Sequence, residues 1–156
     1  MRRWLALAAL IAALDQLAKF AIARMLDAGN GIEVAPFFNL VLVHNRGAAF
    51  SLLASAPGWQ RELFIAIALI ASAWVVYLLR KHPQQTLFCL ALSLILGGAI
   101  GNVIDRVLVG AVIDFLDFHV AGYHWPAFNV ADSAITCGAV LLVWESLRPQ
   151  DGRGKG

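Results

Sequence analysis

The chain alternates long apolar stretches with two more polar segments. Four stretches are long and apolar enough to cross a hydrocarbon core about 30 Å thick. They comprise residues 4–23, 63–79, 87–104 and 130–147. The second has no charged residue, whereas the first contains Asp15 and Lys19 and the fourth has Asp132 near its start. The pattern therefore predicts an all-α membrane protein with four transmembrane helices, forming a single domain over residues 1–156.

Two segments between the apolar stretches have the pattern of short β-strands. Residues 37–45 read F-F-N-L-V-L-V-H-N, and residues 112–118 read V-I-D-F-L-D-F. Enrichment in β-branched and aromatic residues favours strands. Open strand edges are costly in lipid, so we expect a small extracytoplasmic β element at or above the membrane surface. Residues 48–54 are typical of a short interfacial helix, and the polar, Gly-rich tail 149–156 predicts disorder.

Composition narrows the class of protein further. Apolar residues make up 60% of the chain, charged residues make up 14%, and the mean hydropathy is +0.73. A soluble domain of this size could not bury so much apolar surface, so the excess must face lipid. The formal charge of +2 gives no indication of nucleic-acid binding. These values exclude a soluble enzyme, a nucleic-acid-binding protein and a disordered chain.

The two cysteines are too few for a disulfide framework or a zinc site. Cys89 lies near the inner end of the third stretch, and Cys137 lies about two turns inside the outer end of the fourth. The difference in depth puts them beyond the reach of a disulfide. We therefore expect both to be small packing residues.

The positions of Lys and Arg predict the orientation in the membrane. Seven of them flank the apolar stretches on the side of both chain ends, and four lie on the other side. Cytoplasmic loops carry the excess of positive charge, so both termini are expected in the cytoplasm. Segments 24–62 and 105–129 then lie outside. Asp15 and Lys19 interrupt the first stretch before any cleavage-like sequence, which favours a retained helix over a signal peptide.

Polar residues inside the apolar stretches are candidate functional residues because burying them in lipid is costly. Asp15 and Lys19 are four residues apart with the acid first, an order that favours an ion pair on one helix face. Such a pair could orient the helix or help to position a substrate. Gly97 and Gly101 form a G-x-x-x-G spacing, which predicts close approach of another helix.

Two polar groupings occur at the outer ends of the third and fourth stretches. Asn102, Asp105 and Arg106 occupy neighbouring positions on one helix face, which indicates either part of a site or an anchor at the interface. Asn129 and Asp132 have the spacing of a capping box at a helix start, which is the alternative to a chemical role.

A further carboxylate lies in the second strand-like segment. Asp114 is flanked by Ile113 and Phe115, where a free carboxylate has no evident structural role, and Asp117 falls on the opposite face of a strand. Whichever of the two shares a face with Asp132 could pair with it. Two close carboxylates at a low-dielectric boundary share a proton, so one acts as base toward water and the other as acid. This is the chemistry of an aspartyl peptidase. The histidine spacings do not indicate a metal site.

Five sequence blocks occur in a fixed order along the chain. They are D-Q-L-A-K at 15–19, N-R-G-A-A-F-S at 45–51, G-N-V-I-D-R at 101–106, V-I-D-F at 112–115 and F-N-V-A-D-S at 128–133. With these blocks the sequence resembles the bacterial lipoprotein signal peptidase family, the type II signal peptidases, over most of residues 4–147. The resemblance implies a catalytic pair of Asp114 and Asp132 at the outer face of the bacterial inner membrane.

The resemblance also implies a set of supporting polar residues, namely Asp15, Asn45, Asn102, Arg106 and Asn129. It implies an aspartic endopeptidase that cuts the signal peptide from a diacylglyceryl-modified prolipoprotein, just before the lipidated cysteine. No cofactor or metal is expected, and globomycin-type cyclic peptides are expected to inhibit by occupying the site.

A lipid-anchored substrate would arrive laterally through the bilayer. The outer strand segment and residues 48–54 could then lie on the membrane and clamp it. Two other classes of protein remain open from the residues themselves. A proton-coupled transporter would also place carboxylates in its spans, although no repeat is visible. A non-catalytic membrane scaffold would explain the glycines but would not explain Asp114.

Overall fold

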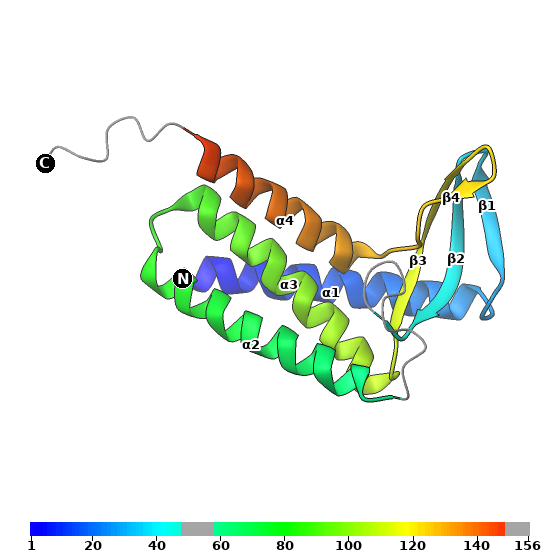
Figure 1. The fold of residues 1–156 in the computed structure, drawn as a ribbon, viewed down its shortest axis with the longest axis horizontal. Helices are drawn as coiled ribbons and strands as arrows, with labels where there is room; N and C mark the ends of the chain where they lie inside the picture. Colours follow the sequence, from blue (N-terminus) through cyan, green and yellow to red (C-terminus); the bar gives the residue numbers. More distant parts are fainter. Residues whose placement is uncertain (48–57, 149–156) are drawn as a thin grey trace, which may run out of the picture.

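The computed structural model of the protein describes residues 1–47 and 58–148. These residues form four long helices and four strands, joined by turns and loops. The helices are α1 (Arg2–Met25), α2 (Gln60–Lys81), α3 (Thr86–Leu108) and α4 (Val130–Leu147). The strands are β1 (Gly31–Ala35), β2 (Phe38–Asn45), β3 (Val112–Val120) and β4 (Tyr123–His124). Figure 1 shows the helices side by side and the sheet at one end of them. The predicted fold class is confirmed.

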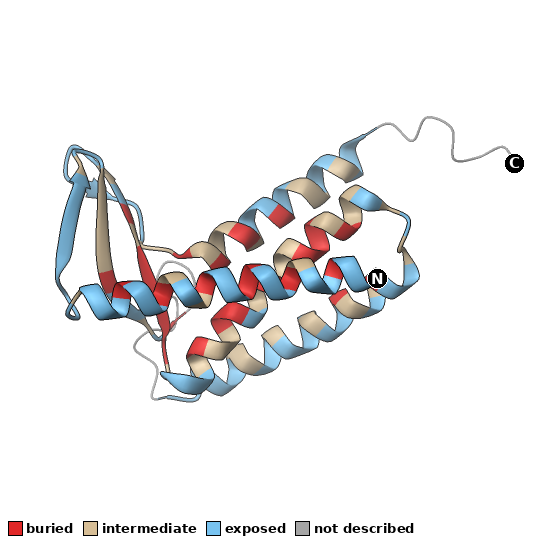
Figure 2. Cartoon of the chain, turned by 180° about the vertical axis from the view of Figure 1, so that it is seen from behind, coloured by how far each residue is buried: buried red, intermediate tan, exposed pale blue. Residues whose placement is uncertain are grey.

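All four helices are long and apolar enough to cross a membrane. The predicted range of α4 matches the structure, and the other three helices extend a few residues beyond the predicted stretches. The helix proposed at 48–54 and the tail 149–156 lie outside the described residues. α3 is the central helix, since α1, α2 and α4 all pack against it. Figure 2 shows buried residues along α3 and on the inner face of α1, whereas most of α2 is exposed.

Glycines on α3 allow the neighbouring helices to approach closely, as predicted. A Cβ atom on Gly97 would lie 2.7 Å from the Ala8 carbonyl oxygen of α1. On Gly98 a Cβ atom would collide with the Ala131 carbonyl oxygen of α4. These contacts leave no room for a larger side chain, because packed atoms do not approach so closely. The small residues of α3 therefore set the positions of both α1 and α4.

The sheet is antiparallel and has the order β1-β2-β3-β4. β2 and β3 correspond to the two predicted strand segments, and their register pairs Val43 with Asp114 and Asn45 with Val112. β1 and β4 were not predicted. An irregularity in the pairing between Leu40 and Val43 interrupts β2. The first half of β3 is buried against the helix ends, whereas β1 is almost fully exposed. β3, together with the buried Leu42 of β2, therefore joins the sheet to the helices.

Candidate active site

A cavity of about 780 Å³ lies where the helix ends meet the sheet. Its walls come from β2, the C-terminal end of α3, β3, the segment 125–128 and the first turns of α4. Asp114 and Asp132 both line it, and Asp117 does not. The structure thereby decides between the two β3 carboxylates: Asp114 is the one that shares the cavity with Asp132.

Asp114 is a buried carboxylate on β3, with only 2% of its surface exposed. Its Oδ1 accepts a hydrogen bond from Asn129 Nδ2 at 2.7 Å, and its Oδ2 accepts one from Asn45 Nδ2 at 3.1 Å. The sequence suggested a carboxylate without structural partners, but each oxygen has an amide donor from a different part of the chain. These bonds stabilise the ionised form and fix the direction of the carboxylate.

Asp132 lies in the first turn of α4 and is half-buried. Its Oδ1 accepts a hydrogen bond from Asn102 Nδ2 at 2.8 Å, and its backbone N–H donates to Asn129 Oδ1 at 2.8 Å. Asn129 therefore caps α4, which is one half of the predicted capping box, while the Asp132 side chain accepts from Asn102. The side chain of Asp132 points to Asn102 and into the cavity, which leaves it available for chemistry.

Asn129 links the helix cap to the second carboxylate. It is fully buried, and its amide nitrogen also approaches the Ile113 carbonyl oxygen at 3.2 Å and Asn102 Oδ1 at 3.3 Å. Because Asn129 Oδ1 accepts from a backbone N–H, its NH₂ group must face Asp114. The orientation of this amide is therefore determined by its neighbours.

A buried charge cluster adjoins the pair. Lys19 Nζ lies 2.7 Å from Asp15 Oδ2, 2.7 Å from Asp105 Oδ2 and 3.0 Å from Asn102 Oδ1. The predicted ion pair of Asp15 and Lys19 is confirmed, and Asp105 is an additional partner. All three charged groups are 2% exposed or less, so the cluster is held out of water.

The same cluster joins α1 to the elements that carry the pair. Asp15 Oδ1 accepts from the Ala131 backbone N–H at 2.8 Å, and Asp105 Oδ2 accepts from the Ile113 N–H at 3.1 Å. Gln16 Nε2 donates to Asp105 Oδ1 at 2.8 Å and to a backbone oxygen of α3. Gln16 was not among the predicted site residues, although it is a polar residue in an apolar stretch like its neighbour Asp15.

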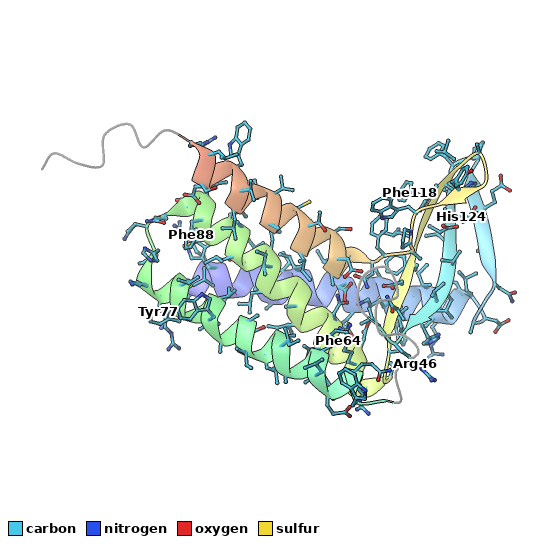
Figure 3. The ribbon with its side chains drawn as sticks, in the orientation of Figure 1. Arg46, Phe64, Tyr77, Phe88, Phe118 and His124 are labelled. Carbon is cyan, nitrogen blue, oxygen red and sulfur yellow. The ribbon has the colours of Figure 1, made fainter. Side chains whose placement is uncertain are left out.

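Arg106 connects the C-terminal end of α3 to Gly47, two residues after β2 ends. Its Nη2 donates to the Gly47 carbonyl oxygen at 3.0 Å, and its guanidinium lies 5.0 Å from the centre of the Phe64 ring of α2. Figure 3 places Phe64 and Arg46 at this same end of the molecule. Arg106 lines the cavity with Arg46, so both supply positive charge to its wall.

The two β3 carboxylates have opposite electrostatic surroundings. Burial, and then the charge of Asp132, raise the pKa of Asp114 to about 7, against the hydrogen bonds from Asn45 and Asn129. Burial also raises the pKa of Asp117, but hydrogen bonds from His124 and Asn39 outweigh this and bring it below its usual value. A carboxyl group that keeps its proton near neutral pH is suited to acid–base catalysis.

The two cysteines differ from each other in the structure. Cys89 is buried, as expected for a packing residue, but Cys137 is exposed and lines the cavity. The packing prediction for Cys137 is wrong because the buried face of α4 is formed by Ala131, Ala134 and Gly138, and Cys137 lies to one side of that face.

The exposed thiol gives a direct test of the cavity. We expect a membrane-impermeant methanethiosulfonate reagent to modify Cys137 and to lower substrate cleavage, since the added group would fill part of the cavity. Cys89 should remain unmodified because it is buried. A Cys137→Ser variant should cleave normally and resist the reagent. Full activity of the modified wild-type protein would show that the cavity does not hold substrate.

No group of three or more His, Cys, Asp or Glu side chains is arranged to hold a metal ion within residues 1–47 and 58–148. The aspartate pair, with its amide donors, can polarise a water molecule and exchange protons with a substrate without further groups. Of the supporting residues implied by the resemblance, Asn45, Asn102 and Asn129 bond to the pair and Asp15 bonds to the start of α4. Arg106 lines the same cavity but bonds to backbone oxygens of Asn102 and Gly47.

Comparisons with known proteins agree on one protein family. The model of the family described as "Signal peptidase (SPase) II" matches residues 7–148. A "Lipoprotein signal peptidase" of Paraburkholderia phymatum is 60% identical over 145 residues, covering 93% of this chain and 87% of the relative. A protein of the same name from Janthinobacterium sp. (strain Marseille) is 59% identical over 148 residues, covering 95% of this chain and 90% of the relative.

Two solved structures share the fold. One, described as "Bacterial membrane enzyme structure by the in meso method at 2.3 A resolution", has a TM-score of 0.87 and 34% identity. The match covers 100% of this chain and 94% of that one. A second, described in the same words at 1.9 Å resolution, has a TM-score of 0.84 and 35% identity over 96% of both chains.

Proposed function

Because the chain belongs to the signal peptidase II family, we infer that Asp114 and Asp132 are the catalytic pair of a prolipoprotein-processing protease. Removal of signal peptides from prolipoproteins is the activity of the family, so the transporter and scaffold alternatives are excluded. One observation carries the assignment: carboxylates from β3 and α4 line a single cavity, and each is held by a buried amide.

The pair can supply both proton transfers that peptide hydrolysis needs. One carboxylate takes a proton from a water molecule. The oxygen of this water attacks the carbonyl carbon of the peptide bond before the lipidated cysteine. The other donates its proton to the carbonyl oxygen. The tetrahedral intermediate then collapses, the C–N bond breaks, and the amine leaves with a proton from the pair. The two carboxylates titrate as a unit, so the reaction needs the singly protonated state.

The supporting residues hold this geometry and shape the wall of the cavity. Asn45, Asn102 and Asn129 donate hydrogen bonds to the pair. Asp15 accepts from the backbone at the start of α4, and Arg106 holds the Gly47 carbonyl. Such positioning contributes to rate because the reacting groups are already aligned when substrate binds.

The cavity fits a substrate that is partly a peptide and partly a lipid. Polar residues surround the aspartates, whereas Ile135 and the exposed side chain of Cys137 continue its wall along α4. A diacylglyceryl-modified prolipoprotein that approaches through the bilayer would place its peptide bond at the pair and its chains along the helices. Cyclic peptides of the globomycin type would compete for the same cavity.

A direct experiment tests the assigned function. The purified protein in detergent or lipid is incubated with a diacylglyceryl-modified precursor, and the released signal peptide is identified by mass spectrometry. We expect one cut, just before the modified cysteine, and no cut in the unmodified precursor. Cleavage at other positions, or of both precursors equally, would contradict the proposed substrate class.

The orientation of the chain in the bacterial inner membrane gives a separate prediction. Figure 1 shows the start of α1 and the end of α4 at the end of the molecule opposite the sheet. Since positive residues are in excess there, we expect reporter fusions after Arg148 to report the cytoplasm and fusions at Gly122, in the β3–β4 turn, to report the outside. An external signal after Arg148 would reverse the orientation and place the pair on the wrong side.

The electrostatics of Asp114 predict the alkaline limit of activity. Its pKa of about 7 means that the pair loses its shared proton as the pH rises through this value, so turnover should fall above about pH 7. The Asn45 amide favours the ionised form, so Asn45→Ala should raise this pKa and move the alkaline limb to higher pH. The matched variant Asn39→Ala, which loses a bond to Asp117, should leave the limb in place. A downward shift in Asn45→Ala would contradict the assignment.

A further inference from the structure

Lys19 reaches the aspartate pair only through another side chain. Its Nζ donates to Asn102 Oδ1 at 3.0 Å, and Asn102 Nδ2 donates to Asp132 Oδ1 at 2.8 Å. Lys19 is 1% exposed and does not line the cavity, so it cannot touch a substrate. An ammonium group has only donors, so the oxygen of Asn102 must face Lys19 and its NH₂ group must face Asp132.

The charges around Lys19 do not cancel. Its ammonium lies between the carboxylates of Asp15 and Asp105, each at 2.7 Å, so the three groups carry a net charge of −1 when all are ionised. All three are buried, where charges act over longer distances than in water. The positive charge of Lys19 opposes the upward effect of burial on the pKa of Asp114.

We propose that Lys19 is a positioning residue for signal-peptide cleavage, which orients the Asn102 amide toward Asp132 and supplies a buried positive charge to the aspartate pair. Asp105 is its counterpart: it holds Lys19 in place and supplies a negative charge to the same region. The inference rests on the proposed role of Asp114 and Asp132 as the catalytic pair.

Other charged or titratable groups also face the pair, and they are left unchanged in the test. Arg106 of α3 and Arg46 after β2 line the cavity, and His44 of β2 lines it as well. Asp15 contacts Lys19 from the same helix. Substitutions at Lys19 and Asp105 leave these groups in place, so opposite changes of charge within one cluster can be compared directly.

The two substitutions should have opposite effects on the pH dependence of cleavage. Lys19→Gln removes a positive charge, which disfavours the ionised carboxylates, so the pH profile of kcat should move up by about 1 unit. Asp105→Asn removes a negative charge, so the profile should move down by about the same amount. In Lys19→Gln, kcat should fall about tenfold because Asn102 is free to turn, while KM stays unchanged.

Asp105→Asn is compatible with the surrounding hydrogen bonds. Its remaining oxygen can accept from Lys19 and from the Ile113 N–H, as Oδ2 of Asp105 does. The Gln16 amide can turn to accept from the new NH₂ group, which gives up the bonds that its Nε2 donates to the Gly101 carbonyl oxygen and to Asp15. If Lys19→Gln does not fold, the pH profile of kcat in Asp105→Asn tests the proposal: a downward shift supports it, and an unchanged profile contradicts it.

Gln16→Ala is the matched control. It removes hydrogen bonds to Asp15 and Asp105 in the same cluster but no charge. It should lower stability without moving the pH profile. A cluster that merely holds the helices together would lower activity in all three variants and leave the profile in place, which would overturn the proposal. Asp114→Asn in the same assay tests the pair itself, because full activity of this variant would refute the catalytic assignment. An inactive Asp114→Asn, together with unchanged pH profiles in Lys19→Gln and Asp105→Asn, would refute only the role of Lys19.

Discussion

Asp114→Asn and Asp132→Asn are each expected to reduce cleavage of a lipid-modified precursor by several orders of magnitude. Each substitution keeps the shape of the side chain but removes a group that accepts or donates a proton. General acid–base catalysis alone contributes about 10²–10⁴-fold. Because the two carboxylates act as a unit, the double variant should be little slower than either single variant. Single-turnover cleavage per folded molecule is the measurement.

Asp117→Asn is the matched control for Asp114→Asn, since both residues are buried carboxylates on β3. Asp117 is bound by His124 and Asn39 at the other end of the strand, which Figure 3 marks by the labels of Phe118 and His124. Its substitution should change activity little. Normal cleavage by Asp114→Asn together with an inactive Asp117→Asn would mean that the wrong carboxylate has been assigned.

The fold should survive the substitution at Asp114. The buried charge is costly, and its removal offsets the loss of one of the two amide hydrogen bonds. Asp132→Asn keeps the cap of α4, because the cap bond is made by the backbone N–H of residue 132. Thermal unfolding followed by circular dichroism should therefore show midpoints close to that of the wild type for both variants. A large fall in either midpoint would show that the residue has a mainly structural role.

The parts of the fold that follow from local sequence were predictable. Apolar runs of about 20 residues can form only spanning helices in lipid, and β-branched segments gave β2 and β3. β1 was not predicted because the sequence of Gly31–Ala35 has no buried face: its residues are almost all exposed, and it is a strand only through pairing with β2. β4 has two residues and depends in the same way on pairing with β3.

The candidate site was predictable in its residue types but not in its connections. The residues alone made Asp132 and either Asp114 or Asp117 candidates, and the resemblance to the family then selected Asp114. Periodicity could not show that Lys19 also contacts Asp105, because that contact joins α1 to α3. Gln16 was missed for the same reason, since its partner is the same distant carboxylate. Helix spacing describes one face of one helix, whereas the cluster is defined by how three elements pack.

Asn129→Asp is expected to separate the cap of α4 from the chemistry of the pair. Asp and Asn are about equally good at helix N-caps, so the bond from the backbone N–H of Asp132 should be kept. Repulsion between the two buried carboxylates should lower stability, so cleavage is measured per folded molecule. The new carboxylate would replace the amide donor that lies 2.7 Å from Asp114 Oδ1. Loss of one such donor beside a reacting group costs about 10²–10³-fold in kcat, and we expect at least this loss, measured with saturating precursor.

The same exchange at Asn39 provides the control. Asn39 Nδ2 donates to Asp117 Oδ2 at 3.0 Å, so Asn39→Asp also places a carboxylate against a β3 carboxylate, but away from the cavity. Repulsion should weaken the sheet locally while cleavage continues. Asn129→Asp also introduces a negative charge beside Asp114, which should raise the pKa of Asp114. The alkaline limb of the pH–activity profile should therefore move to higher pH in the activity that remains. If Asn129→Asp cleaves as fast as Asn39→Asp, residue 129 only caps the helix and does not hold the catalytic carboxylate.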